Sequence, residues 1–268
     1  MKIPVSVIVV TKNEEKSILD CLQTLTFFDE IIVVDSASQD RTCQVVQDNG
    51  YVIVPFNWNR QYPKKRQWCL DNISLKHDWV LFIDADERMT EALAREIEEA
   101  LKSSENFAGY FLKGRHVLNG KVLKHGLQNN KIALLNRRQM EFPVIDDLDI
   151  PGMGEIEGHY QPVLKQGVSA DIGQLEEAIL HLSMEDPRAW IFRHQKYARW
   201  ERGMNEKGAW PKDPVPWREK TKTFLRQSRF RPQIIFYLSY IFCLGFLDGK
   251  EGLTYARHKR EYYRLISQ

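Results

Sequence analysis

The sequence predicts an α/β fold in which a mostly parallel sheet is flanked by helices. Four runs of β-branched or apolar residues alternate with segments that have the apolar spacing of helices; these runs are 5–10, 29–35, 51–56 and 79–84. Because strand and helix alternate in this way, parallel strands joined by right-handed crossovers are the simplest topology.

The pattern changes after a helix rich in Glu and Ala, which is expected near 90–103. The segments AGYFLKGR, VLNGKVL and KIALLNR that follow have the pattern of strands joined by hairpins. Asn119-Gly120 supplies a hairpin turn, since both residues tolerate a positive φ. We therefore expect a parallel first half followed by a mixed, more antiparallel half.

The C-terminal part differs from the rest of the chain in charge. Residues 1–187 carry 20 Lys and Arg against 29 Asp and Glu, a balance of −9, whereas residues 188–268 carry 18 against 7, a balance of +11. We therefore predict a main domain at 1–186 and a basic, partly apolar helical extension at 187–268. Such a basic segment favours an anionic partner, either nucleic acid or anionic lipid.

The cysteines and the N-terminus predict a cytoplasmic protein. The four cysteines are scattered and show no spacing of the zinc or redox kind. The six-residue apolar run near the N-terminus is shorter than the core of a signal peptide. Reduced thiols are expected in such a chain.

Polar side chains follow three of the predicted strands. They are Thr11, Lys12, Asn13 and Glu14 after the first, Asp35 after the second, and Asp84, Asp86 and Glu87 after the fourth. The carboxyl ends of parallel strands meet at one sheet edge, where α/β proteins bind ligands. Helix capping is the alternative for Asn13 or Asp35 taken singly. Together, these residues predict a shared site.

An Asp-x-Asp pair occurs twice and is weak evidence by itself, because about one match is expected by chance in a chain of this length. Asp84 and Asp86 follow a buried strand, whereas Asp147 and Asp149 lie between two prolines, in a predicted loop. Only the first pair is expected to be rigid enough to bind a metal-diphosphate.

Three segments in order resemble the nucleotide-sugar motifs of glycosyltransferase family 2, the inverting enzymes with the GT-A fold: VSVIVVTKNEE, IIVVDSASQDRT and WVLFIDADE. Within that family, the resemblance is greatest to the bacterial lipopolysaccharide core glycosyltransferases. It is supported by two later segments, LHLSMEDPRAWIFRHQKYARWE and RPQIIFYLSYIFCLGFLDGKEG. The resemblance covers most of the chain and is strongest over 1–90. It implies a nucleotide-sugar half at 1–104 and an acceptor half at 105–186.

The resemblance also implies a role for individual residues. A divalent metal, Mg²⁺ or Mn²⁺, is implied at Asp86, with His181 as a further ligand; a hydrogen-bonded core histidine is the alternative for His181. Arg66 is implied near the diphosphate, with a solvated helix face as its alternative. The residues implied to line the nucleotide pocket are Thr11, Asn13, Glu14, Asp35 and, near the ribose, Asp84.

The general base is sought in GMGEIEGHYQP. The acceptor hydroxyl must lose a proton as it attacks, and a carboxylate opposite the diphosphate would accept it. Glu155 and Glu157 point to one face if this segment is a strand; a pair of solvent-facing acids is the alternative. Related enzymes place a catalytic Glu in a short motif here, often after a His, whereas here Ile156 precedes Glu157 and His159 follows. We choose Glu157.

These features together predict a metal-dependent, inverting glycosyltransferase of the hexosyltransferase type. It would move a sugar from a nucleotide sugar, UDP-linked by expectation, to a lipid-linked saccharide such as lipopolysaccharide core. A sugar nucleotidyltransferase is one alternative, although VTKNEEKS lacks the Gly-rich, Lys-bearing start expected for triphosphate binding. A non-catalytic membrane-associated scaffold that retains the fold is the other.

The apolar stretch 233–247 predicts where the protein sits. Its fifteen residues fall short of the roughly 20 that a helix needs to span a bilayer, and basic residues flank it on both sides. We expect an interfacial helical hairpin on the anionic inner face of the cell membrane, with a buried helix packed on the body as the alternative. Nucleic-acid binding is not expected, since no recognition motif accompanies the charge.

Overall fold

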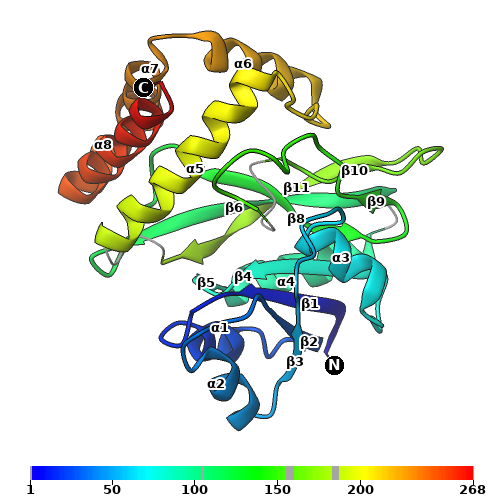
Figure 1. Cartoon of the computed structure of the whole chain (residues 1–268). Helices are drawn as coiled ribbons and strands as arrows, with labels where there is room; N and C mark the ends of the chain where they lie inside the picture. Colours follow the sequence, from blue (N-terminus) through cyan, green and yellow to red (C-terminus); the bar gives the residue numbers. More distant parts are fainter. Residues whose placement is uncertain (1, 104–105, 155–159, 183–186, 268) are drawn as a thin grey trace. The chain divides into compact units, whose positions relative to one another are not determined.

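The computed structural model describes residues 2–103, 106–154, 160–182 and 187–267, and it contains two compact units (Figure 1). Unit 1 consists of Met1–Gly114, Asn130–Phe142 and Pro162–Leu182. Unit 2 consists of Arg115–Asn129, Pro143–Gln161 and Ser183–Gln268. Unit 2 thus combines the basic extension with two segments of the predicted acceptor half.

The first half of unit 1 is the predicted parallel sheet. Strand β1 pairs in parallel with β2 and with β4, and β2 pairs in parallel with β3, which gives the order β3-β2-β1-β4. The strands are β1 (Ile3–Thr11), β2 (Phe28–Asp35), β3 (Val52–Pro55) and β4 (Trp79–Asp84). All four predicted strands are therefore confirmed.

The second half continues the same sheet in mixed orientation. Beyond β4 the order is β8-β6-β11-β5, with β8 antiparallel to β4 and β5 antiparallel to β11. These strands are β5 (Glu87–Arg88), β6 (Phe107–Leu118), β8 (Asn129–Asn136) and β11 (Asp171–His181). The short strands β9 (Met140–Glu141) and β10 (Val163–Leu164) form a separate antiparallel pair. The predicted α/β class with a mixed second half is confirmed.

The predicted hairpin is also present. Strand β7 (Lys121–Val122) pairs with the end of β6. The turn residues Asn119 and Gly120 have φ angles of 52° and 73°. Both values lie in the left-handed region that a two-residue hairpin turn of this kind requires.

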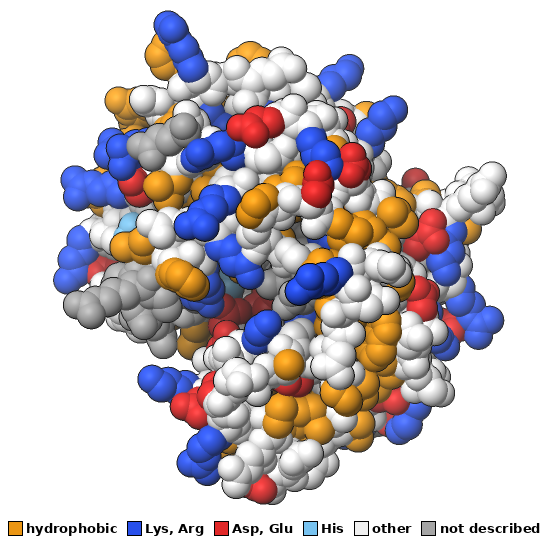
Figure 2. Space-filling view, viewed as in Figure 1, with side chains coloured by type: hydrophobic (Ala, Val, Ile, Leu, Met, Phe, Trp, Pro, Cys, Tyr) orange, Lys and Arg blue, Asp and Glu red, His pale blue; other side chains and the backbone are white. Residues whose placement is uncertain are grey.

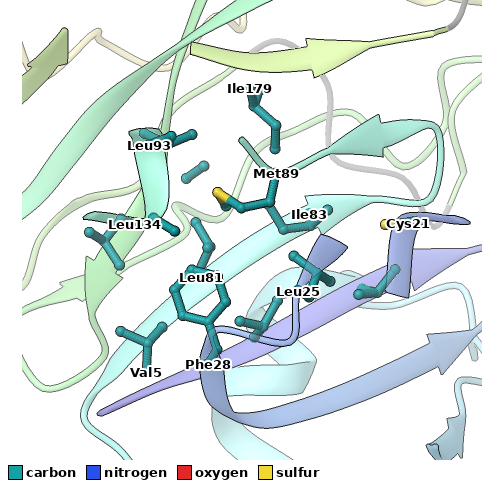
Figure 3. Packing of buried hydrophobic residues seen from close by; sticks show 14 of the residues in the cluster. Val5, Cys21, Leu25, Phe28, Leu81, Ile83, Met89, Leu93, Leu134 and Ile179 are labelled. Carbon is teal, nitrogen blue, oxygen red and sulfur yellow. The ribbon is translucent and has the colours of Figure 1, made fainter. Parts of the chain in front are cut away.

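Helices cover both faces of the parallel strands. Val5, Val7 and Val9 alternate toward one face, where they join a core of fully buried side chains. The helices that contribute to this core are α1 (Ile18–Thr24), α2 (Thr42–Asp48) and α4 (Glu91–Lys102). Figure 3 shows Leu81, Ile83, Met89 and Leu93 pointing toward one another in it.

The opposite face carries α3 (Lys65–Asn72). There the Phe82 and Phe142 rings meet edge to face, with centroids 5.7 Å apart. The Gln67 side-chain oxygen of α3 accepts the Phe142 N–H at 2.8 Å. Apolar residues on alternate sides of β4 thus bury both faces of the strand, which explains why its sequence is continuously apolar.

Unit 2 is mostly helical. Its helices are α5 (Pro187–Lys207), α6 (Pro216–Gln227), α7 (Arg231–Tyr237) and α8 (Gly249–Ile266). Trp190 and Ala198 of α5 are buried against Tyr255 and Tyr262 of α8. The Tyr262 hydroxyl donates to Glu201 at 2.8 Å, so the polar tip of this aromatic residue is satisfied inside the core.

The apolar stretch 233–247 is not one continuous helix. It begins in α7, continues through a π-helical turn (Leu238–Phe242) and ends in a 3₁₀ turn (Gly245–Asp248), with Leu244 at a φ of 58° between the turns. Among the described residues, no single helix is long and apolar enough to cross a bilayer. The bent pair Arg231–Phe242 and Gly245–Ile266, at 69°, meets the criteria of length and composition together.

Candidate active site

The strand register brings the predicted polar residues to one edge of the sheet. Thr11 at the end of β1 lies opposite Asp35 of β2, and the preceding Val10 lies opposite Asp84 of β4. Three strand ends therefore present Thr11, Asp35 and Asp84 side by side, as expected for the carboxyl edge of a parallel sheet.

The loops that follow β1 and β2 are tied to each other. The Asn13 N–H donates to the Ser38 hydroxyl at 2.8 Å, and the Asn13 side-chain oxygen accepts the Gln39 N–H at 2.7 Å. The Glu14 N–H donates to the Thr42 hydroxyl at 2.8 Å. Asn13 adopts a φ of 57° to make these bonds. Because its side chain bonds to the facing loop, the capping interpretation is wrong for Asn13.

Asp35 is almost fully buried, with 4% of its surface exposed. Its carboxylate accepts the Ser38 N–H at 2.9 Å and the Ser38 hydroxyl. It therefore organises its own loop and does not cap α2, which has no side-chain cap. The buried Thr11 and Ser36 hydroxyls beside it have no hydrogen-bond partner within the described part of the chain. Buried polar groups are normally paired, so these two hydroxyls are unusual features of the strand ends.

The Asp84 carboxylate lies between two cations. Its Oδ1 is 3.2 Å from the Arg66 guanidinium and its Oδ2 is 2.8 Å from the Lys131 ammonium. Burial alone would raise the pKa of Asp84, but Lys131 and Arg66 outweigh it and hold this pKa well below its usual range. Arg66 thus faces the strand ends from α3 instead of extending into solvent.

Lys131 and Glu87 belong to the same cluster. Glu87 is 2% exposed; its Oε2 accepts the Asp84 N–H at 2.9 Å, and its Oε1 lies 2.8 Å from the Lys131 Nζ. Burial raises the pKa of Glu87, and Lys131 partly offsets the rise. The sequence analysis identified Glu87 as a carboxylate at the strand end but did not identify Lys131 as a site residue. A lysine beside the apolar run of β8 was its only signal.

Asp86 and His181 face each other. The pairing of β5 with β11 aligns His181 with Glu87, and the Leu182 N–H donates to the Asp86 carbonyl at 2.9 Å. As a result, the His181 Nε2 lies 3.3 Å from the Asp86 Oδ2. Burial lowers the pKa of His181, but the Asp86 carboxylate outweighs this effect and raises it. In the described ranges, no cluster of three or more His, Cys, Asp or Glu side chains is arranged to hold a metal.

The remaining sequence candidates divide into two groups. Glu155 and Glu157 lie outside the described residues, so their role as base stays a prediction. The second Asp-x-Asp pair lies in a loop, as predicted. There the buried Asp147 accepts the Trp200 indole N–H at 3.1 Å, and Asp149 binds the Lys207 ammonium at 2.6 Å.

The family model described as glycosyl transferase family 2 matches residues 6–147, which is more than half of the chain and includes the ends of β1, β2 and β4. The chain belongs to glycosyltransferase family 2. The three ordered motifs predicted this family. Asp84, Asp86 and Lys131 lie within the matched region, whereas His181 lies outside it.

This family 2 glycosyltransferase is also similar to individual proteins. The lipopolysaccharide core biosynthesis glycosyltransferase LpsC of Rhizobium meliloti (strain 1021) is 34% identical over 123 residues, which cover 44% of this chain and 45% of LpsC. An uncharacterized glycosyltransferase of Rickettsia bellii (strain RML369-C) is 32% identical over 112 residues, or 41% of this chain and 37% of that protein. The chain thus matches less than half the length of these relatives.

Among solved structures, a similar one is glucosyl-3-phosphoglycerate synthase from Mycobacterium tuberculosis in complex with Mn²⁺, uridine diphosphate and glucosyl-3-phosphoglycerate. The sequence identity is 24% and the TM-score is 0.34, with 42% of this chain and 44% of that chain covered.

Proposed function

We propose that this glycosyltransferase transfers a hexose from a UDP-linked donor to a lipid-linked saccharide, with a divalent metal and with inversion at the anomeric carbon. The observation that carries the proposal is the arrangement at the end of β4. There Asp84 is fixed between Arg66 and Lys131, and Asp86 faces His181. A rigid set of carboxylates beside an imidazole and a guanidinium suits a metal-bound diphosphate.

The nucleoside part of the donor would bind at the ends of β1 and β2. The buried Thr11 and Ser36 hydroxyls there lack partners in the described structure, so a polar ligand would satisfy both. Asn13 and Glu14 hold the two loops together through the bonds to Ser38, Gln39 and Thr42 described above. We assign the base and ribose to the pocket lined by Thr11, Asn13, Glu14 and Asp35, with Asp84 near the ribose.

The residues present fit a divalent metal. Asp86 offers a carboxylate oxygen and His181 a ring nitrogen 3.3 Å away, and both side chains are largely buried. Two protein ligands leave further positions for water and phosphate oxygens, which is how Mg²⁺ is commonly held beside a substrate phosphate. When bound, the metal would neutralise the charge that develops on the leaving diphosphate. Arg66 would approach the same diphosphate from α3, since its guanidinium already faces the anionic strand end.

The base that deprotonates the acceptor would be Glu157, with Glu155 as the competing assignment. A general base contributes on the order of 10² to 10⁴ in rate. Glu157→Gln is therefore expected to keep nucleotide binding while lowering turnover by at least about 10². If Glu155→Gln has this effect instead, the assignment of the base moves to Glu155.

The donor and reaction are tested with the purified full chain and a panel of nucleotide sugars in the presence of Mn²⁺. A donor that binds the folded state raises the thermal unfolding midpoint. Release of free UDP, with the opposite anomeric configuration in the product by NMR, supports the proposal. Release of pyrophosphate from a triphosphate would identify a nucleotidyltransferase, and neither product would identify a scaffold.

The proposed acceptor class rests on two observations. The name of the similar LpsC protein places that relative in lipopolysaccharide core biosynthesis. The second observation is an exposed apolar surface of unit 2, which we call the 230–247 surface. Its members are between 45% and 77% exposed; they are Phe230, Tyr237, Ile241, Phe242, Leu244, Phe246 and Leu247. Large contiguous apolar exposure of this kind is typical of a partner or membrane contact.

The charge around the 230–247 surface supports anionic lipid as its occupant. Exposed basic residues flank it in the sequence: Arg229, Lys250, Arg257 and Arg260. Figure 2 shows Lys and Arg side chains interspersed with hydrophobic ones over the helices of unit 2. Each basic residue near an anionic leaflet contributes about 1 kcal/mol, and the apolar side chains add a contribution that salt does not screen. We therefore propose peripheral binding to the cytoplasmic face of the cell membrane.

Flotation with anionic vesicles tests the membrane proposal. The double variant Phe242→Ser, Leu247→Ser is expected to lose most of its vesicle binding at low salt. A matched control is Val144→Ser, Leu148→Ser, which changes exposed apolar residues elsewhere in unit 2. The control should float like the wild type. If the wild type does not float at low salt, or if both double variants float equally well, the membrane proposal is wrong.

A further inference from the structure

Three carboxylates follow one another closely at the end of β4, at Asp84, Asp86 and Glu87. Three acidic groups so close together repel one another, and Glu87 is buried. The sequence of β4 and its turn therefore needs a cation from another strand. His181 faces Asp86, and Lys131 meets both Asp84 and Glu87.

Lys131 reaches this point through the pairing of β4 with β8. Trp79 pairs with Asn136 and Leu81 with Leu134 in an antiparallel register. Continuing this register by three residues sets Lys131 opposite Asp84. The position of the ammonium is thus determined by the sheet and not by a flexible loop, which is the usual requirement for a precisely positioned group.

The contacts form a closed ring around the turn. The Asp84 N–H donates to the Glu87 Oε2 at 2.9 Å. The Glu87 Oε1 lies 2.8 Å from the Lys131 Nζ, which in turn lies 2.8 Å from the Asp84 Oδ2. The backbone and the side chain of Asp84 are therefore held by the same pair of partners. Asp86 lies inside this ring-closed turn, so its direction depends on the ring.

We infer that Lys131 and Glu87 are positioning residues, which hold Asp84 in place and thereby orient Asp86 for donor binding. The inference rests on the donor site proposed above. In this arrangement, Lys131 acts through Asp84 and Glu87 and does not contact the donor. Burial of Lys131 would lower its pKa, but Asp84 and Glu87 outweigh burial and raise it, so the ammonium remains charged.

The inference makes a specific prediction about charge balance. Lys131→Met leaves two neighbouring carboxylates, one of them buried, without their shared cation, and unpaired buried charge is costly. Glu87→Gln in the same chain removes one of those carboxylates and keeps an oxygen that accepts the Asp84 N–H. The double variant is therefore expected to regain much of what Lys131→Met loses. A lysine that contacted the donor directly would not be replaced in this way.

The experiment measures UDP binding in the presence of Mn²⁺ by calorimetry, and the donor KM and kcat separately. Lys131→Met is expected to weaken UDP binding by about 10- to 100-fold, the usual cost of losing a group that orients a ligand-binding residue. Lys131→Arg, which keeps the charge, should remain within about threefold of wild type. The double variant with Glu87→Gln should recover at least about tenfold relative to Lys131→Met.

Lys113→Met is the matched control, because Lys113 is also a strand lysine of unit 1 that pairs with a carboxylate, Glu176. It should bind UDP like the wild type. The inference would be overturned if K131M bound UDP as tightly as the wild type. It would also be overturned if the double variant bound UDP as weakly as K131M. If K131M does not fold, the UDP affinity of the double variant is compared with that of the wild type instead. Absence of UDP binding by the wild type would instead contradict the proposed donor site.

Discussion

The chain contains two Asp-x-Asp pairs of identical spacing, and their surroundings differ completely. In unit 1, Asp84 lies between Arg66 and Lys131 at the end of a buried strand, and Asp86 faces His181. In unit 2, Asp147 is buried against the Trp200 indole and Asp149 extends to Lys207 at the surface, with 71% of its side chain exposed.

The difference teaches what makes such a pair useful. In the second pair, the Asp147 carboxylate accepts an indole N–H inside the core, and the Asp149 carboxylate is screened by solvent. In the first pair, Arg66 from a helix and Lys131 from another strand hold the Asp84 carboxylate at the sheet edge, and Asp86 faces His181. Spacing is common to both pairs, whereas rigid support from neighbouring strands and helices distinguishes the first pair.

The largest expected effect comes from removing the second Asp of each pair. Asp86→Ala should lower sugar transfer by at least about 10²-fold and weaken metal-dependent UDP binding, because the charge on the leaving diphosphate loses its stabilisation. Asp149→Ala is the control and should transfer sugar at the wild-type rate. Equal activity of the two variants, measured as UDP release, would show that the sites do not differ in function.

Removal of the imidazole should have the next largest effect. His181→Ala is expected to weaken Mn²⁺ binding in the presence of UDP by about 10- to 100-fold, since a group that orients or binds the metal is lost. His77→Ala is the matched control, because His77 also contacts an aspartate, Asp29, at 2.9 Å. This contact is away from the carboxyl ends of the strands. Calorimetric titration with Mn²⁺ measures both, and unchanged affinity in His181→Ala would exclude it as a ligand.

The effects on stability should be the reverse of those on activity, because the second pair contributes to the fold and not to catalysis. Asp147→Ala leaves the fully buried Trp200 indole N–H without this acceptor, which should lower the free energy of unfolding by about 1–3 kcal/mol. The activity of the folded fraction should be unchanged. Asp149→Ala should affect unfolding much less, because its pair with Lys207 is exposed. Urea unfolding curves of the two variants make this comparison, and equal losses would contradict it.

Acid titration should show the smallest difference. Asp213 of unit 2 pairs with Lys222 at 2.6 Å and its side chain is 1% exposed. Burial would raise the pKa of Asp213, but the hydrogen bonds from Lys222 and the Val215 N–H and the charges of Lys222 and Arg218 together outweigh burial, so the pKa is lowered on folding. A carboxyl with a lowered pKa stabilises the fold above its unfolded value of about 3.9, and this stability is lost as the pH falls through the folded value. Burial also lowers the pKa of Lys222, which weakens the pair at alkaline pH.

The free-energy difference between wild type and Asp213→Asn should therefore shrink below about pH 4 and should persist in high salt. Asp149→Asn is the exposed comparison: any difference it shows at neutral pH should disappear in high salt. Urea unfolding at several pH values measures both variants. A salt-sensitive effect at Asp213 would mean that burial does not protect this pair.

Much of unit 1 follows from the sequence by local physics. The four parallel strands and the acids at the end of β4 were predicted, and so was the Asn119-Gly120 turn of unit 2, because each depends on neighbouring residues: apolar runs, the change from buried to polar at a strand end, and tolerance of positive φ. The family motifs depend on the same short segments. The capping alternative for Asn13 is wrong because its side-chain oxygen accepts the N–H of Gln39, which lies 26 residues further along the chain.

The partners of the site were decided by the tertiary structure. The sequence by itself determined that Asp84 and Asp86 stand at a strand end, and that His181 ends a later strand. Only strand pairing brings Lys131 to Asp84, from which it is separated by 47 positions in the sequence. In the same way, strand pairing brings His181 to Asp86 across 95 positions. A side chain's charge and hydrogen-bonding capacity are local properties, but its environment depends on register and burial. Register and burial are set by the packing of the whole sheet, which no short segment of the sequence specifies.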